Sequence, residues 1–298
     1  MIARWQRISV LLILLAMAVW LAWQWPQSPV CAVLGALLPL ALYLLVMAVQ
    51  FGLMHTVNRA DPAPRARLAQ VLAAWWAEVS TGLAVFCWRQ PFLSRSVPDW
   101  LPAQPTGQRG VVLVHGFMCN RGLWLPWFAR LQGAGHAYVA VNLEPVLGSI
   151  DAYASTVEDA VQRVTAATGM APVLLCHSMG GLAARAWLRA YQADGRVHRV
   201  LTLGTPHAGT WPGRFSSAVN GQQMSLAGEW VLTLRRDEPA GRAALFTCWY
   251  SNCDNIVFPT STAALLGADN RLVQGVAHVE MAFDPQVMEA CMREIGRD

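Results

Sequence analysis

The chain has 298 residues, which is enough for one catalytic domain with an additional segment. Hydrophobic residues make up 55% and charged residues only 13%, which excludes an ordinary soluble domain and indicates membrane segments. The net charge is +4, all 22 basic residues are arginine, and no basic face interleaved with aromatic residues is present, so no nucleic-acid partner is expected. The seven cysteines have no metal-binding spacing, which predicts free thiols and no metal site.

Residues 1–58 are predicted to form a transmembrane helical hairpin. No Asp, Glu, Lys or Arg occurs from position 8 to position 58. The apolar runs 8–25 and 30–54 are separated by Pro26 and Pro29, and at ~1.5 Å per residue each covers most or all of a ~30 Å hydrocarbon core. A buried core hairpin and a cleaved signal peptide are the alternatives. No small-residue cleavage site follows the first run, which disfavours the signal peptide.

The arginines predict the orientation of this hairpin. Arg4 and Arg7 precede the first run, arginines 59, 65 and 67 follow the second, and the connecting turn has none. The positive-inside rule therefore places both ends in the cytoplasm. We expect a bacterial-type inner-membrane protein whose catalytic domain faces the cytoplasm.

Residues 59–109 are expected to hold an amphipathic, interfacial helix and a proline-rich linker. Positions 68–88 are apolar, and Glu78 is the only charged residue among them. This helix is expected to lie in the membrane interface or to pack on the catalytic domain. A third span is the competing hypothesis; it would bury Glu78 in lipid and move the catalytic domain to the other side. The stripe at helical spacing consists of Leu68, Val71, Leu72, Trp75, Val79, Leu83 and Phe86.

Residues 110–298 alternate between strands and helices and are predicted to form the catalytic domain. Strands are expected at 111–114, 137–141, 172–175, 200–203, 245–250 and 272–276, and helices at 123–132, 149–168, 182–193 and 285–295. This alternation predicts the α/β class, with a mostly parallel sheet covered on both faces. Residues 210–244 lack a strand pattern. They are expected to be a cap over the site or an extended surface loop.

Residues 173–181 read VLLCHSMGG, which predicts a strand, a sharp turn and a helix with Ser178 at the turn. Such a turn exposes the serine hydroxyl above the sheet, so Ser178 is the predicted nucleophile. Gly180 lets the helix pass close to the strand. The motif is G-x-S-x-G with Cys176 in place of the first glycine, which changes the expected strain of the turn.

A serine nucleophile needs a base that titrates near neutral pH. His278 follows the last strand, and catalytic groups gather at the carboxyl ends of such strands, so it is the predicted base. Asp254 follows the strand 245–250 and is expected to orient His278 and stabilise its charged form. Asp237, in a charged run, and Asp269, before the last strand, are the competing acids.

The backbone N–H groups of Phe117 and Met179 are expected to form the oxyanion hole. Phe117 follows the strand 111–114, and Met179 follows the nucleophile. Gly116 would leave room for the substrate carbonyl. His115, Gly116 and His207 are expected to line the substrate.

These residues resemble those of the α/β-hydrolase superfamily, specifically triacylglycerol-lipase-like and GPI-inositol-deacylase-like serine esterases. The resemblance covers about residues 110–295. It is carried by HGF at 115–117, HSMGG at 177–181, GTPHAG at 204–209 and the Asp254/His278 pair. It implies the α/β-hydrolase fold, whose reference sheet has eight strands. The six strands predicted here imply that the first two are missing.

The sequence therefore predicts a membrane-anchored serine hydrolase that cleaves lipid or fatty-acyl esters through an acyl-enzyme, without a metal or organic cofactor. An acyltransferase that uses the same triad is the alternative within enzymes. A catalytically inactive membrane adaptor is the alternative of another class, and the intact triad argues against it. The oligomeric state is left open.

Overall fold

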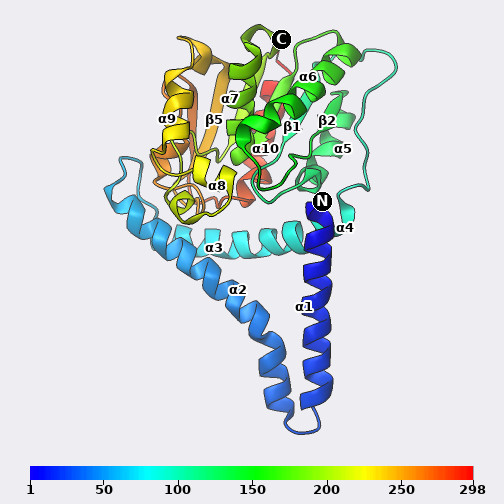
Figure 1. Cartoon of the computed structure of the whole chain (residues 1–298), viewed down its shortest axis with the longest axis vertical. Helices are drawn as coiled ribbons and strands as arrows, with labels where there is room; N and C mark the ends of the chain where they lie inside the picture. Colours follow the sequence, from blue (N-terminus) through cyan, green and yellow to red (C-terminus); the bar gives the residue numbers. More distant parts are fainter. Residues whose placement is uncertain (298) are drawn as a thin grey trace.

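The computed structural model describes residues 1–297 and contains a six-stranded parallel sheet in the order β2-β1-β3-β4-β5-β6 (Figure 1). Parallel pairing requires a crossover after each strand and brings all carboxyl ends to one edge. All predicted strands are present, and the last begins earlier than expected. The strands are β1 (Val111–Val114), β2 (Tyr138–Ala140), β3 (Val173–His177), β4 (Arg199–Leu203), β5 (Phe246–Ser251) and β6 (Asp269–Val273).

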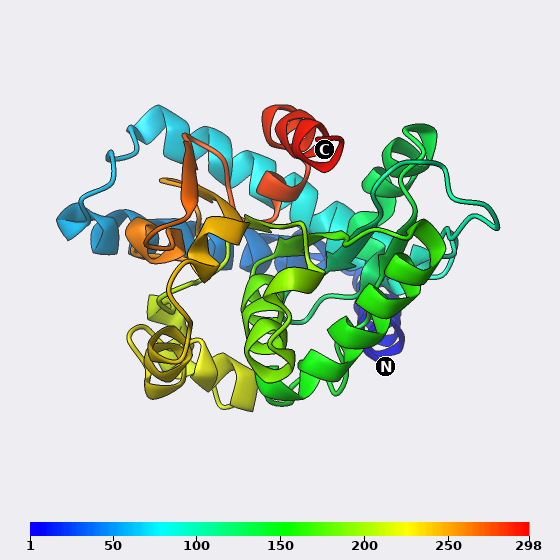
Figure 2. The same ribbon diagram turned by 90° about the horizontal axis from the view of Figure 1, so that it is seen from above.

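The sheet is covered by helices on both faces. Alternate residues of a strand point to opposite faces, so Val111 and Leu113 pack in the apolar cluster with α5 (Leu125–Gly133) and α10 (Pro285–Ile295). Val112 and Val114 pack in the cluster with α6 (Ala154–Thr168) and α7 (Met179–Tyr191). Figure 2 shows α10 (red) and α7 (green) on opposite sides of the sheet. Burial on both faces explains why the strands are continuous apolar runs.

The first two helices form a hairpin that projects away from the sheet domain (Figure 1). They are α1 (Ile2–Gln24) and α2 (Pro29–Val57), and the Ser28 side chain caps the start of α2. Most of their large apolar side chains are exposed. Three helical stretches, Ile2–Gln24, Pro29–Ala60 and Leu68–Leu93, are long and apolar enough to cross a membrane.

The third stretch crosses beneath the sheet domain (Figure 1). It consists of α3 (Leu68–Gly82), the π-helical η2 (Leu83–Arg89) and α4 (Gln90–Leu93). The predicted apolar stripe is wrong in part. Val71 and Val79 are buried, but Leu68 and Leu72 are 69% and 58% exposed. The buried face of α3 also carries Ala74, Glu78 and Gly82. Ala74 packs in an apolar cluster with Phe51 and Met54 of α2, and Gly82 lies against the Tyr43 side chain. Glu78 accepts hydrogen bonds from the loop after β6.

Residues 210–244 form short helices beside α7. The fully buried Arg185 on α7 makes a two-pronged ion pair with Glu238, at 2.7 and 2.9 Å. Asn220 donates to Val146 O at 2.9 Å, which ties the segment to the loop before α6. The elements are η6 (Trp211–Phe215), α8 (Val219–Gln223), α9 (Glu229–Arg236) and η7 (Arg242–Leu245).

Short 3₁₀ turns complete the description of residues 1–297. They are η1 (Asn58–Ala60), η3 (Arg121–Trp124), η4 (Ile150–Tyr153), η5 (Asp194–Arg196), η8 (Thr260–Ala263) and η9 (Glu280–Ala282). The seven cysteines are free thiols, as predicted, and all except Cys31 and Cys87 are buried.

Candidate active site

Ser178 lies on a strained turn between β3 and α7. Its φ of 56° falls in the left-handed region, which a non-glycine residue occupies only at a cost of about 1–3 kcal/mol. The turn is held because Ser178 N–H donates to Leu203 O on β4 at 2.8 Å. A Cβ on Gly180 would collide with Val114 O and lie 2.8 Å from His115 O, so only glycine fits there. The sequence thus builds the turn expected for an exposed serine nucleophile.

Cys176, which replaces the first glycine of the motif, is a core residue. Its side chain is fully buried in the cluster that α6 and α7 share with the sheet. Burial raises the pKa of this thiol well above its usual range, so it stays neutral. The motif position therefore tolerates a small apolar side chain while Ser178 keeps its strained φ.

His278 and Asp254 form a buried hydrogen-bonded pair at the carboxyl edge of the sheet. His278 Nδ1–H donates to Asp254 Oδ2 at 2.8 Å. Asp254 Oδ1 accepts from the N–H groups of Ile256 and Val257, at 2.9 and 2.7 Å, so both carboxylate oxygens are fixed. Burial alone would lower the pKa of His278, but the charge and hydrogen bond of Asp254 raise it above its usual value. The ring is therefore oriented with Nε2 free to accept a proton.

Gly204 connects the serine turn to this pair. It follows Leu203, whose carbonyl binds Ser178 N–H, and it has a φ of +58°. A Cβ at this position would lie 2.9 Å from Asp254 Oδ2 and 3.1 Å from His278 Nδ1. Within residues 1–297, Ser178 Oγ makes no hydrogen bond to the His278 ring, a contact that in hydrolases often tightens only with substrate.

The loop after β1 lies directly against Ser178. A Cβ on Gly116 would be 2.7 Å from Ser178 Cβ and 3.3 Å from Ser178 Oγ. His115 holds this loop, because its Nδ1–H donates to Gly116 O at 2.9 Å and its Nε2 accepts from Leu143 N–H at 3.0 Å. Burial lowers the pKa of His115 to about 4, which keeps the ring neutral. Both ring nitrogens are thus engaged with backbone groups inside the protein.

The predicted oxyanion donors are the backbone N–H groups of Met179, which directly follows Ser178, and Phe117, in the loop after β1. Met179 is the first residue of α7, where a helical N–H has no partner four residues earlier. Phe117 follows Gly116, where an added Cβ would lie 2.7 Å from Ser178 Cβ. Donors at a helix start also benefit from the positive end of the helix dipole. This arrangement suits an oxygen that gains negative charge during a reaction.

The other two histidines near the site serve as internal hydrogen-bond partners. His177 Nε2–H donates to His278 O at 3.1 Å, and burial lowers the pKa of His177 to about 3. His207 Nε2 lies 3.1 Å from Thr202 Oγ1 and 3.4 Å from Cys248 Sγ. Burial also holds the pKa of His207 well below its usual value. Neither of these two partners belongs to the set Ser178, Asp254 and His278.

Helices outside the sheet domain contribute polar contacts to the site that the sequence did not predict. Glu78 on α3 accepts from Val279 N–H at 3.0 Å and from Glu280 N–H at 3.1 Å, directly after His278. Asn255 Oδ1 accepts from His278 N–H at 3.3 Å, and its amide donates to Gln50 of α2 at 3.0 Å. The sequence offers one indication of the Glu78 contact, which is an acidic residue in an apolar helix. This pattern does not identify the group that the carboxylate binds.

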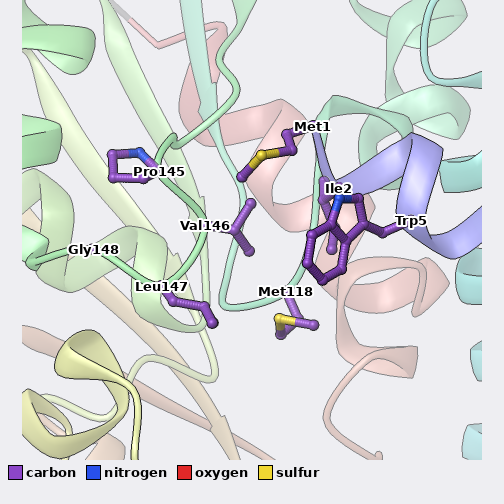
Figure 3. Close-up of a pocket in the computed structure, with 8 residues that line it drawn as sticks. All are labelled: Met1, Ile2, Trp5, Met118, Pro145, Val146, Leu147 and Gly148. Carbon is purple, nitrogen blue, oxygen red and sulfur yellow. The ribbon is translucent and has the colours of Figure 1, made fainter.

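An apolar cavity of about 370 Å³ lies between the start of α1 and the loops that follow β1 and β2 (Figure 3). Met118 lines it and directly follows Phe117. The amide of Gln6 on α1 donates to Met118 O at 3.2 Å, which fixes α1 against this loop. The lining residues are Met1, Ile2, Trp5, Met118, Pro145, Val146, Leu147 and Gly148.

No cluster of three or more His, Cys, Asp and Glu side chains in residues 1–297 is arranged to hold a metal ion. Ser178, Asp254 and His278 follow strands β3, β5 and β6, in the chain order serine, aspartate, histidine that is typical of α/β hydrolases. Residues 111–289 match the model of the alpha/beta hydrolase family, and the chain belongs to that family.

Solved structures agree on the fold. The chain resembles the mature lipase BlEst2 of Bacillus licheniformis, with a TM-score of 0.58 and 15% identity over 67% of this chain and 97% of that one. It also resembles lipase B of Aspergillus fumigatus, with a TM-score of 0.57 and 19% identity over 66% of this chain and 56% of that one. No curated protein matches the sequence.

The close contact at Gly204 generates a test of the site's geometry. Gly204→Ala should weaken the Asp254–His278 hydrogen bond, because the added Cβ collides with both side chains. Gly169→Ala is the matched control, since Gly169 has a φ of +72° and no atom within 4 Å of an added Cβ. Both variants should lose about 1 kcal/mol or more of unfolding free energy in urea from backbone strain.

Only Gly204→Ala should also slow the reaction with a fluorophosphonate probe, by at least about tenfold. Equal reaction rates for the two variants would contradict the assigned contact.

Proposed function

We propose that this α/β hydrolase is a membrane-anchored serine hydrolase that cleaves carboxylic esters of lipids or fatty acids. The observation that carries the proposal is the buried 2.8 Å hydrogen bond between His278 and Asp254 at the sheet edge that also holds the strained Ser178. An ordinary structural serine would have no reason to occupy a left-handed backbone conformation.

In the proposed reaction, His278 Nε2 takes the proton of Ser178 Oγ as this oxygen attacks the ester carbonyl. The N–H groups of Phe117 and Met179 stabilise the negative oxygen of the tetrahedral intermediate. His278 then gives the proton to the departing alcohol, which leaves an acyl group on Ser178. Water, activated by the same histidine, attacks this acyl-enzyme and releases the acid. Asp254 stabilises the charged ring in both steps.

The apolar cavity beside Met118 supports an acyl substrate. Its wall contains the side chains of Ile2, Trp5 and Leu147 (Figure 3). Met118, which also lines it, directly follows Phe117, one of the proposed oxyanion donors. A hydrocarbon chain placed there gains about 0.8 kcal/mol for each CH₂ group removed from water. Since α1 forms part of this wall, we infer that the acyl chain reaches the site along the membrane-embedded helix.

The proposed nucleophile and acid can be tested by substitution. Ser178→Ala should lower the rate of ester hydrolysis by about 10⁴- to 10⁶-fold without unfolding the protein. Asp254→Asn should lower it by about 10⁴-fold, because His278 would lose its orienting partner. Asp237→Asn is the control, since this carboxylate is partly exposed and pairs only with Arg189 and Arg236. If the Ser178→Ala variant hydrolysed the ester at a rate within tenfold of the wild type, Ser178 would not be the nucleophile.

The proposed acyl site predicts a change in chain-length preference. Leu147→Asp should lower kcat/KM for a long-chain ester by about tenfold, because a charge in the wall disfavours hydrocarbon. Hydrolysis of a butyrate ester should stay within about twofold. Leu266→Asp is the control, because Leu266 is 80% exposed and does not line this cavity. An equal loss on both esters would place the acyl chain elsewhere.

For the membrane, we propose that α1 and α2 span the bilayer and that α3 lies along its surface. On α3 the face turned away from the sheet domain carries Leu68, Leu72 and Trp76, which are 58–69% exposed. The opposite face carries Glu78, which is bound to the sheet domain. A helix with an apolar outer face and a docked inner face is stable at an interface, whereas a third span would have to break the Glu78 contacts.

The arginine distribution supports an orientation with the catalytic domain in the cytoplasm. Alkaline phosphatase, which is active only outside the cytoplasm, should be inactive when fused after residue 297. The same reporter inserted between Gln27 and Ser28 should be active, because this turn lies across the membrane. A strongly active C-terminal fusion would indicate three spans and an exported active site.

A further inference from the structure

We propose that Glu78, on the surface helix α3, is a positioning residue for the base His278. It fixes the backbone that carries the ring and adds a carboxylate beside that backbone. This inference rests on the proposed function, because it assigns to Glu78 a role in the reaction of Ser178 and His278.

The contacts of Glu78 are those of a capping carboxylate. Its side chain is 3% exposed, and its oxygens accept from the N–H groups of Val279 and Glu280 at 3.0–3.1 Å. These N–H groups lie at the start of η9, where helical donors lack internal partners. Hydrogen bonds from N–H groups to a carboxylate are stronger than those between neutral groups. The peptide groups that follow His278 are therefore held in place by a residue some two hundred positions earlier in the chain.

The backbone of His278 is held from two other directions as well. Asn255 Oδ1 accepts from His278 N–H at 3.3 Å, and His177 Nε2–H donates to His278 O at 3.1 Å. Glu78 differs from both because it carries a charge. The Glu78 hydrogen bonds are also the contacts that join α3 to the backbone after His278. The loss of Glu78 would therefore change the base in a way that loss of a neutral contact would not.

The charge of Glu78 acts directly on the His278 ring. Burial raises the pKa of Glu78 to about 7, although the nearby His278 and the two N–H donors lower it, and Asp254 raises it further. Glu78 in turn raises the pKa of His278, together with Asp254. The remaining titratable groups around the pair are Tyr43 of α2, His177 and Glu280. Near neutral pH, protonation of Glu78 thus makes His278 a weaker base.

The test compares Glu78→Gln with Glu158→Gln in the full-length chain in detergent. Glu158 is a matched control, because it is a buried carboxylate held by Arg196, Trp187 and Gln162, none of which contacts the site. The first readout is the titration of His278 by NMR with ¹³C-labelled histidine. The second is the pH profile of kcat and KM for a soluble ester.

Glu78→Gln keeps an oxygen that accepts an N–H bond but removes the charge. The His278 midpoint and the acid limb of kcat/KM should both move to a pH lower by about 1, because a nearby negative charge is lost. At pH 8, kcat should fall by about tenfold with KM changed less than twofold, since ring placement matters in the transition state. Glu78→Asp, which keeps the charge on a shorter side chain, should restore the midpoint. Glu158→Gln should leave all readouts unchanged.

The proposal would be overturned if the Glu78→Gln variant kept both the wild-type midpoint of the His278 titration and the wild-type acid limb of kcat/KM. If that variant fails to fold, the wild type with ¹³C-labelled Glu carboxyl groups decides. A Glu78 titration near neutral pH that is mirrored in the His278 curve supports the coupling, and a titration near pH 4.5 without such an inflection overturns it. The NMR result is independent of turnover. A wild type that fails to react with a fluorophosphonate would therefore refute the proposed function separately.

Discussion

The hydrogen bond between Asp254 and His278 depends on the carboxyl edge of a parallel sheet, and most of the surrounding structure serves to hold it. Asp254 follows β5 and His278 follows β6, so the register of two neighbouring strands sets their separation. Gly204, which follows β4, lies where any side chain would push the two apart. Parallel pairing therefore determines where the site lies, because it brings the carboxyl ends of neighbouring strands to the same edge of the sheet.

The three helices that precede the sheet domain contribute polar contacts to the loops of the candidate site. Each contacts a different loop: Gln6 of α1 the loop after β1, Gln50 of α2 the loop after β5, and Glu78 of α3 the loop after β6. These side chains are polar groups at the domain-facing positions of otherwise apolar helices. Movement of these helices relative to the sheet would therefore change the catalytic loops at three points.

Sequence reasoning recovered the local parts of this arrangement. The strands, the turn at Ser178 and the residues after β5 and β6 follow from patterns a few residues long. The partner of Glu78 lies some two hundred positions away, and no local pattern encodes it. The predicted apolar stripe on α3 was wrong in part, because its residues do not all lie on one face of the helix. In a soluble helix the large apolar residues mark the buried face, but Leu68 and Leu72 point away from the domain.

Figure 1 shows α3 and the start of α1 on one side of the sheet domain, where they contact the loops after β6 and β1. The apolar cavity lies on this side as well, because Met1 and Trp5 at the start of α1 line it. In the proposed orientation this side faces the bilayer. Moving a fatty-acyl chain from the bilayer into water costs about 0.8 kcal/mol of free energy for every CH₂ group that becomes exposed. Extraction of a long chain through water would therefore have a large free-energy barrier. A site whose cavity wall is a membrane helix avoids that exposure. In the proposed arrangement these helices serve two purposes, since their apolar faces contact the bilayer and their polar residues Gln6, Gln50 and Glu78 hold the loops of the candidate site.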